Sequence, residues 1–224
     1  MQAKVYIIGS SGHAKVVIDA IEAEANYQIA GLLDDFKMVG ETTLGYPVIG
    51  DLTYISSLAI LTEPEPVNLF IAVGDNFNRR AIAEKINAMG KKVNYIRVLH
   101  PKASISKYTN IGYGSIVMAN ATLAPEVQIG SHTIINHNAS VDHDCILAAF
   151  CSIAPGAVLS GNVHLGELTA IGTGSNIIEK ITVGHNSVIG AGATVTHSID
   201  ENQLAIGCPA KAIKIRAMGE KYLK

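Results

Sequence analysis

The sequence predicts two units of different fold class, an α/β Rossmann-like unit over residues 1–98 and an all-β parallel β-helix over residues 99–200, followed by a tail over residues 201–224. Two observations support this division. An aliphatic residue recurs at every sixth position between residues 99 and 195, and this repeat is absent before residue 99. Neither an amphipathic helix nor a hairpin keeps a period of six, whereas a parallel β-helix does.

The six-residue repeat is uninterrupted, since all seventeen residues reached in steps of six from Leu99 to Val195 are Leu, Ile or Val. Three hexads make a triangular coil of about 18 residues, and coils stack about 4.8 Å apart, so residues 18 apart lie above one another. Small residues two positions before the aliphatic, such as Ala121 and Thr133, are expected to fill the corners. Glycines that follow the aliphatic are expected to help the chain turn: Gly112, Gly130, Gly166, Gly172, Gly184 and Gly190.

A purely structural solenoid, such as an antifreeze protein or an adhesive spacer, is the alternative interpretation of the repeat. Such proteins tend to be regular on the outside as well. Here the outward positions are irregular and are expected to carry several histidines, namely His132, His137, His164, His185 and His197. This irregularity favours a functional surface, although a single surface histidine is usually only solvated.

The first 98 residues alternate short aliphatic runs with helical stretches, which is typical of a βαβ arrangement. We expect helices from Lys15 to about Glu24 and around Arg79, Arg80 and Lys85. Strands are expected over residues 5–8, 27–33, 68–73 and 93–98.

A glycine-containing loop, Gly9-Ser10-Ser11-Gly12-His13-Ala14, separates the first strand from the first helix. Backbone amides and a helix N-terminus suit a phosphate there. Asp34 and Asp35 follow about 20 residues later, where a carboxylate can accept hydrogen bonds from a ribose or base. Only two glycines are present, so the loop predicts either nucleotide or nucleotide-sugar binding or merely a tight turn.

Composition excludes several classes of partner. A net charge of −2 and a pI near 6.4 give no basic patch for nucleic acid. No apolar run approaches the roughly 20 residues of a membrane span, and no signal-peptide pattern is present, so we expect a cytoplasmic protein without membrane insertion. Cys145, Cys151 and Cys208 show no disulfide or metal spacing, the first two fit a structural role, and the histidine spacings suggest no zinc site.

Three stretches of the chain resemble a known family: Gly9–Val17, Asn136–Cys145 and Ile206–Lys211. The family comprises left-handed β-helix (hexapeptide-repeat) sugar acetyltransferases with an N-terminal Rossmann-like domain. Its members include sialic acid O-acetyltransferases and the N-acetyltransferases of UDP-4-amino sugars that make bacillosamine-type glycans. The resemblance implies that the β-helix is left-handed.

The resemblance implies that His143 is a general base and that Asp144 assists it. An imidazole is a suitable proton acceptor near physiological pH. Stacking by 18 residues places Gly161 over His143, where a glycine leaves room for a thioester and its amide is suited to an oxyanion. No residue resembles an acyl-carrying nucleophile, which favours direct transfer in a ternary complex.

The resemblance also implies two sets of binding residues. A nucleotide-activated amino sugar would contact Gly9, Ser10, Gly12, His13, Asp34, Asp35 and Phe36. Acetyl-CoA, the co-substrate of a metal-free reaction, would lie between two prisms of a homotrimer that share each active site. Its expected contacts are Asn136, Ser152, Gly172, Thr173, Gly190, Ala191, Gly207, Pro209 and Lys211.

Two points remain open about these acetyl-CoA contacts. Ser152 stands where many relatives carry a second histidine. Lys211, Lys214 and Arg216 are candidates for the 3′-phosphate, but the last two fit a solvated basic tail equally well.

The expected function is therefore acetyl-CoA-dependent N-acetylation of the 4-amino group of a UDP-linked amino-dideoxy sugar in bacterial surface glycan biosynthesis. The segment Asp34-Asp35-Phe36 resembles the part of those enzymes that faces uracil and ribose. O-acetylation of sialic acid or a related sugar is the alternative reaction. An inactive nucleotide-sugar-binding scaffold is the non-enzymatic alternative, and Ser152 is the feature that favours it.

Overall fold

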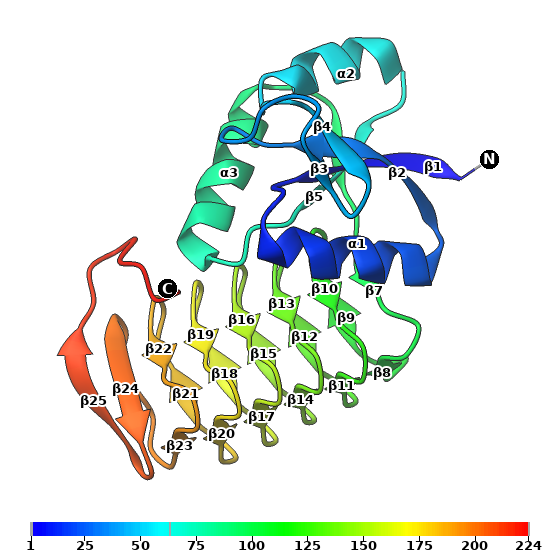
Figure 1. The fold of residues 1–224 in the computed structure, drawn as a ribbon. Coiled ribbons are helices and arrows are strands. Elements are labelled where there is room, and N and C mark those ends of the chain that lie inside the picture. The colour runs from blue at the N-terminus through cyan, green and yellow to red at the C-terminus, as the bar shows by residue number, and fades with distance from the viewer. Residues whose placement is uncertain (1, 63, 224) are drawn as a thin grey trace.

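A computed structural model describes residues 2–62 and 64–223, which form an α/β unit seated on a triangular β-helix (Figure 1). The N-terminal unit contains β1 (Ala3–Ile8), α1 (Gly12–Glu24), β2 (Tyr27–Leu33), β3 (Thr42–Thr43), β4 (Tyr46–Gly50), α2 (Tyr54–Thr62), β5 (Val67–Ile71), α3 (Asn76–Ala88) and β6 (Val93–Tyr95).

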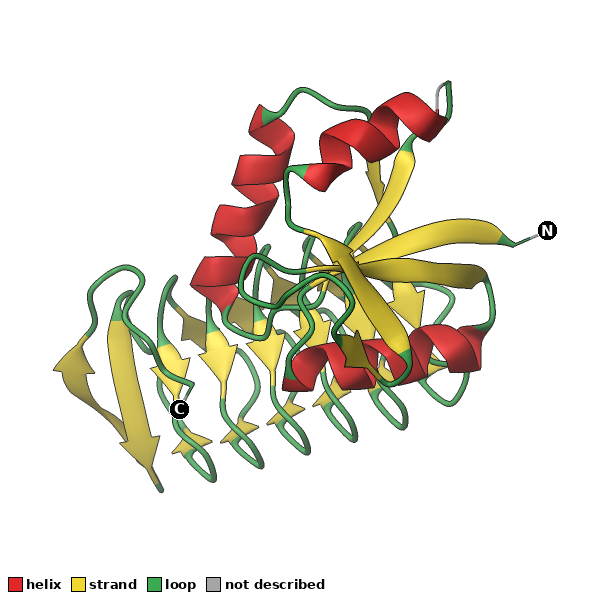
Figure 2. Ribbon diagram, turned by 45° about the horizontal axis from the view of Figure 1, so that its top comes forward, coloured by secondary structure: helices red, strands yellow, loops and turns green. Residues whose placement is uncertain are grey.

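The N-terminal sheet has the strand order β3-β4-β2-β1-β5-β6, and all neighbours are parallel except β3 and β4. Alternate residues of β1 face opposite sides: Val5 and Ile7 pack with α1, and Tyr6 and Ile8 pack with α2 and α3. Helices therefore cover both faces, as Figure 2 shows, which confirms the Rossmann-like prediction. Strands β3 and β4 and helix α2 were not predicted from the sequence, and α1 begins three residues before its predicted start.

The β-helix has three faces of short parallel strands. The first face contains β7 (Val98–Leu99), β10 (Ile116–Val117), β13 (Ile134–Ile135), β16 (Ser152–Ile153), β19 (Ala170–Ile171) and β22 (Val188–Ile189). The second contains β8 (Ser104–Ile105), β11 (Thr122–Leu123), β14 (Ser140–Val141), β17 (Val158–Leu159), β20 (Asn176–Ile177) and β23 (Thr194–Val195). The third contains β9 (Asn110–Ile111), β12 (Gln128–Ile129), β15 (Ile146–Leu147), β18 (His164–Leu165) and β21 (Thr182–Val183).

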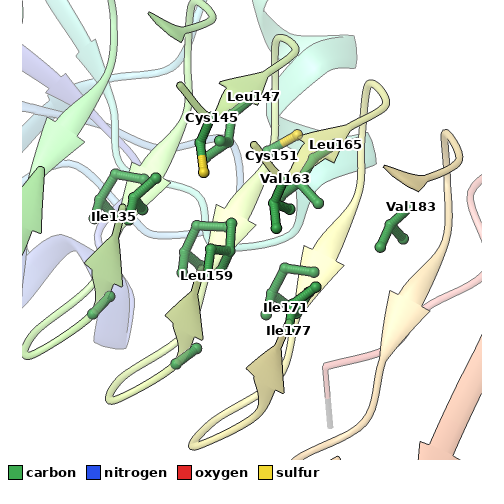
Figure 3. Packing of buried hydrophobic residues seen from close by; sticks show 14 of the residues in the cluster. Ile135, Cys145, Leu147, Cys151, Leu159, Val163, Leu165, Ile171, Ile177 and Val183 are labelled. Atoms are coloured by element: carbon green, nitrogen blue, oxygen red, sulfur yellow. The ribbon is translucent and has the colours of Figure 1, made fainter. Parts of the chain in front are cut away.

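Strand pairing follows the expected spacing of 18 residues, since Leu123 pairs with Val141 and Val141 with Leu159. The aliphatic residues of the repeat, such as Leu159, Ile171 and Val183, fill the axis of the prism (Figure 3). The small residues Ala121 and Thr133 are also buried. The predicted β-helix and its interior columns are confirmed.

The chain turns the corners through residues in the left-handed region, because every sixth residue from Gly114 to Gly192 has a positive φ. The glycines that follow the aliphatic residues are not among them, so the expectation that they help the chain turn was wrong. A Cβ on Gly112 would lie 2.5 Å from the Ser131 nitrogen of the next coil, and one on Gly166 would lie 2.4 Å from the His185 nitrogen. These glycines allow close stacking of coils instead.

Corner side chains also bond to the next coil. Hydroxyls of Ser115 and Thr169 donate to the carbonyl oxygens of residues 130 and 184 at 2.9 and 3.0 Å. The thiols of Cys145 and Cys151 make equivalent contacts with the carbonyl oxygens of residues 160 and 166 at 3.1 and 3.2 Å. Burial raises the pKa of these thiols to about 11 and about 12 respectively, which fits the expected structural role.

Particular strands mark the two ends of the β-helix. The first coil strand already includes Val98, which pairs with Ile116. After Val195, the tail begins as a hairpin of β24 (Gln203–Gly207) and β25 (Ala210–Ile215), and β24 extends the first face beside β22. The last residues then return toward the N-terminal unit (Figure 1).

Candidate active site

His143 lies at the edge where the second and third faces meet, hereafter the His143 edge. The corner Asp142–Cys145 joins β14 to β15 and turns through Asp144, whose φ is +59°. This turn brings the Asp144 carboxylate to His143, with 2.7 Å between Oδ2 and Nδ1. Because Nδ1 donates to the carboxylate, the lone pair of Nε2 remains available.

The carboxylates around His143 favour its protonated form. The hydrogen bond to Asp144 raises the pKa of the imidazole above its ordinary value, and the nearby Asp142 charge adds to the effect. Both side chains of the pair are exposed to solvent. The result is an accessible base of increased strength.

Gly161 lies one coil further along the same edge and faces the imidazole, as the spacing of 18 predicts. A Cβ built on Gly161 would lie 2.6 Å from Cε1 and 2.7 Å from Nε2 of His143. Any side chain at this position would displace the ring. The absence of a side chain at Gly161 thus creates the opening beside Nε2.

The N-terminal loop forms a second cluster around Asp34, at the carboxyl end of β2. The Asp34 carboxylate accepts hydrogen bonds from Ser10 Oγ at 2.5 Å and from the Phe36 and Lys37 amides at 2.9 and 3.2 Å. Burial alone would raise the pKa of Asp34, but these hydrogen bonds lower it below its ordinary value. Lys37, which the sequence analysis did not single out, donates to the Ser10 carbonyl oxygen at 2.9 Å.

Of the other residues predicted to contact the nucleotide sugar, some make structural contacts and others are exposed to solvent. Asp35 accepts from the Leu52 amide at 3.0 Å and pairs with Lys85 at 3.3 Å, so it ties the loop to the segment before α2 and to α3. Phe36 is 98% exposed. Gly9 has φ +102°, and a Cβ there would lie 3.0 Å from the Ala72 carbonyl oxygen, whereas Gly12 begins α1 with open space around it.

A groove of about 810 Å³ runs along the first face, between the N-terminal unit and the C-terminal tail. Six of its lining residues were predicted to contact acetyl-CoA: Asn136, Ser152, Gly172, Thr173, Gly190 and Ala191. His13, in the first turn of α1, and Gly74, shortly after β5, line it on the side where the strand order of the sheet reverses between β1 and β5. Ligands of open α/β sheets bind at such a reversal.

Two histidines, the half-buried His13 and the fully buried His132, are neutral at physiological pH. Burial and, secondarily, the Arg79 charge lower the pKa of His13 to about 4, and its Nε2 atom is buried with no hydrogen-bond partner among residues 2–62 and 64–223. The same causes lower the pKa of His132 to about 4. His132 was expected at the surface, but it is 2% exposed because it stacks on Phe150 and occupies the space left by Gly114.

Arg79 joins the two units and was missed as a site-forming residue. Its guanidinium donates to the carbonyl oxygens of Val73 and Gly74 in the N-terminal unit, and to three carbonyl oxygens of the β-helix, at residues 132, 150 and 151. Asn76 donates to the next coil, at residues 168 and 169. This Arg79–Asn76 clamp fixes the loop that carries Gly74 beside the groove.

The terminal motif lies away from the groove. Gly207, Pro209 and Lys211 belong to the tip of the β24–β25 hairpin and do not line the groove. Lys214 pairs with Glu220 at 2.6 Å. Arg216 is 5% exposed and lines the groove, so the interpretation of Arg216 as part of a solvated basic tail was wrong.

Within one chain, the predicted site residues form separate groups. His143, Asp144 and Gly161 lie on the His143 edge, whereas Ser152 lies on the first face, at the floor of the groove. Within a single chain, the predicted catalytic residues and the predicted acetyl-CoA contact Ser152 therefore lie apart. Helices long and apolar enough to span a membrane, and clusters of potential metal ligands, are absent from residues 2–62 and 64–223.

Comparisons with known proteins agree with this arrangement. Residues 4–86 match the PglD N-terminal domain family. A histidine-to-asparagine variant of perosamine N-acetyltransferase from Caulobacter crescentus, in complex with CoA and GDP-perosamine, has 34% identity and a TM-score of 0.88, covering 95% of this chain and 97% of that one. The acetyltransferase domain of PglB from Neisseria gonorrhoeae, in complex with acetyl coenzyme A, has 37% identity and a TM-score of 0.85, covering 95% and 100%.

A curated relative, UDP-N-acetylbacillosamine N-acetyltransferase from Bacillus subtilis, is 36% identical over 120 residues, which is 51% of each chain. The match thus spans about half the length of that relative. The solved structures that cover nearly the whole chain place it in the class of hexapeptide-repeat, left-handed β-helix sugar acetyltransferases with an N-terminal Rossmann-like unit. Within that class, the chain belongs to the bacillosamine-type family of N-acetyltransferases of nucleotide-linked amino sugars.

Proposed function

We propose that the protein transfers the acetyl group of acetyl-CoA to the 4-amino group of a UDP-linked amino-dideoxy sugar, as a step in bacterial surface glycan biosynthesis. The observation that carries the proposal is the His143 imidazole, bound to Asp144 and facing Gly161. The relatives named for N-acetylation of amino sugars support the choice of N- over O-acetylation.

In this mechanism the sugar amine attacks the thioester carbonyl, so that a C–N bond forms and the C–S bond breaks. His143 Nε2 takes the proton that the nitrogen loses, and the departing CoA thiolate takes up a proton. Asp144 holds the tautomer with hydrogen on Nδ1 and stabilises the imidazolium. The Gly161 amide, on the open side of the ring, is the proposed donor to the developing oxyanion.

The nucleotide part of the substrate is proposed to bind at the end of β1 and β2. The amides around Gly9 and Gly12 suit the diphosphate, and the exposed Phe36 ring suits stacking on a base. Asp34, which already accepts hydrogen bonds from three donors, is proposed to shape this loop and to use its remaining acceptor capacity for the ribose.

We also propose a cytoplasmic homotrimer in which neighbouring subunits share each active site. The support is geometric: the groove and the His143 edge occupy different sides of one prism, so a second subunit must bring its own His143 to the groove. The cytoplasmic location is proposed because acetyl-CoA, the intended co-substrate, is a cytoplasmic metabolite.

The activity is tested by thiol release from acetyl-CoA with UDP-, GDP- and dTDP-4-amino sugars and with sialic acid. The proposal predicts turnover with the UDP-amino sugar and loss of that turnover in His143→Ala. Thiol release with sialic acid as the only acceptor would show O-acetylation instead of N-acetylation. Faster release with GDP-amino sugars would show that the substrate carries GDP instead of UDP. Unchanged turnover in His143→Ala would refute the mechanism, and binding without any turnover would favour a scaffold.

The shared site is tested by mixing two inactive variants, His143→Ala and Gly12→Trp. Mixed trimers would contain sites with an intact loop from one subunit and an intact base from another. Recovery of activity on mixing and subunit exchange supports the trimer proposal. No recovery, despite demonstrated exchange, would contradict it.

A further inference from the structure

The C-terminal tail after β25 is an ordered wall of the groove. Glu220 organises it by pairing with Lys214 and accepting from the Ala217 amide, while its carbonyl oxygen accepts from Arg216 at 2.6 Å. Gly219 packs on Phe77 of α3. This arrangement directs the following residues, Tyr222 and Leu223, into the groove.

The groove floor is an apolar strip with one polar position. The outward residues of the first face are Val98, Ile116, Ile134, Ser152, Ala170 and Val188. The first three are covered at least partly by the N-terminal unit, and the last three line the groove. Ser152 is therefore the single hydroxyl in this column, and the Tyr222 hydroxyl lies 3.4 Å from it.

The hydrogen bonds of Tyr222 leave its proton available to a ligand. Its oxygen accepts from the Asn76 amide, at the N-terminus of α3, at 3.2 Å. The contact with Ser152 is longer than the usual 2.7–2.8 Å of a hydroxyl pair, so it is readily exchanged. Burial raises the pKa of Tyr222, which keeps the phenol protonated, although Ser152, Arg79 and Asn76 oppose that rise.

We propose that Tyr222 is a ligand-binding residue of the groove, donating a hydrogen bond, with Ser152 beside it, to a carbonyl oxygen of the acyl donor. This inference rests on the proposed use of acetyl-CoA. The surrounding apolar strip suits the neutral amide and thioester arm of acetyl-CoA rather than its phosphates. The C-terminal tail is then part of the binding site and not an accessory to folding.

The experiment measures the dissociation constants of acetyl-CoA and CoA for wild type, Tyr222→Phe and Ser152→Ala. One hydrogen bond to a neutral group predicts a roughly 3- to 10-fold weaker binding of acetyl-CoA in Tyr222→Phe. Weakening of acetyl-CoA alone assigns the thioester oxygen, and equal weakening of CoA assigns an amide oxygen of the arm. Tyr108→Phe, an exposed tyrosine of the β-helix, is the matched control.

Limited proteolysis of the tail separates binding from anchoring, since the phenylalanine ring keeps the apolar contacts. The proposal expects the same cleavage rate in Tyr222→Phe as in wild type. Unchanged affinity for both CoA compounds overturns it, as does faster tail cleavage together with weaker nucleotide-sugar binding. Because turnover of the wild type tests the proposed function separately, a protein that binds acetyl-CoA through Tyr222 but acetylates no sugar would contradict only that function.

Discussion

The contact between Gly161 and His143 allows a quantitative prediction for the substitution Gly161→Ala. The new Cβ would lie 2.6 Å from Cε1 of the imidazole, whereas carbon atoms in contact settle about 3.5–4.0 Å apart. The ring must therefore move by about 1 Å. Since His143 is exposed at the end of a rotatable side chain, the ring moves and the backbone does not.

The two consequences of this movement differ in size. A displacement of about 1 Å in a reacting group can lower a rate by about 100-fold, so kcat is expected to fall by about that factor. Stability is expected to stay the same or to rise by up to about 1 kcal/mol, because φ of Gly161 is outside the left-handed region and alanine restricts the unfolded chain.

The assay combines steady-state thiol release with thermal unfolding of the same preparations. Glu179→Ala, at the exposed position one coil further along the His143 edge, is the control and should keep wild-type kcat. A kcat within threefold of wild type in Gly161→Ala would refute the role of the opening. A large drop in melting temperature would instead show that the substitution acts on folding.

Three further predictions concern ionisation and packing. In Asp144→Asn the His143 pKa should fall, so the acidic limb of the kcat/KM profile should move to lower pH as maximal activity declines; an unmoved limb would argue against the pairing. The pKa of His132 is about 4 in the folded protein against an ordinary 6.5, so at acidic pH the folded protein binds fewer protons than the unfolded chain. The contribution of neutral His132 to the free energy of unfolding is therefore complete above pH 6.5, and about 3 kcal/mol should be lost as the pH falls toward 4. Urea titrations of His132→Asn, a substitution that suits the left-handed backbone there, should show a smaller loss of stability in acid than wild type. An identical loss would contradict the role of His132, and the control His197→Asn, at an exposed position, should behave as wild type. A thiol reagent should modify Cys208 in the native protein and the two prism cysteines only after denaturation, and rapid native reaction of all three would contradict the buried corners.

The β-helix was predictable from sequence because its period is set by local geometry. Each coil repeats the same contacts, so the spacing of 18 residues alone predicts that Gly161 lies over His143, as the structure confirms. The role of the glycines after the aliphatic residues in close stacking of coils was not predictable in the same way, since the repeat indicates which residues lie above one another but not how closely the coils approach.

The joint between the units was not predicted, since it depends on contacts between residues 50 to 150 positions apart. One local signal existed: the buried face of α3 consists of Asn76, Arg79, Ala83 and Ile86, so an arginine occupies a stripe that ordinarily holds apolar side chains. His132 likewise became buried through its neighbours Gly114 and Phe150, which are adjacent only in the folded coil.

The Arg79–Asn76 clamp has a consequence for how the sequence can vary. It holds only main-chain oxygens of the β-helix, at residues 132, 150, 151, 168 and 169. Side chains at those positions can be substituted without the loss of any acceptor of the clamp. An 18-residue insertion or deletion between residues 133 and 167 would instead alter which coil each donor meets. The joint therefore tolerates substitution but restricts coil number, and the tail that returns from the last coils to Asn76 and Phe77 of α3 restricts it on the C-terminal side as well.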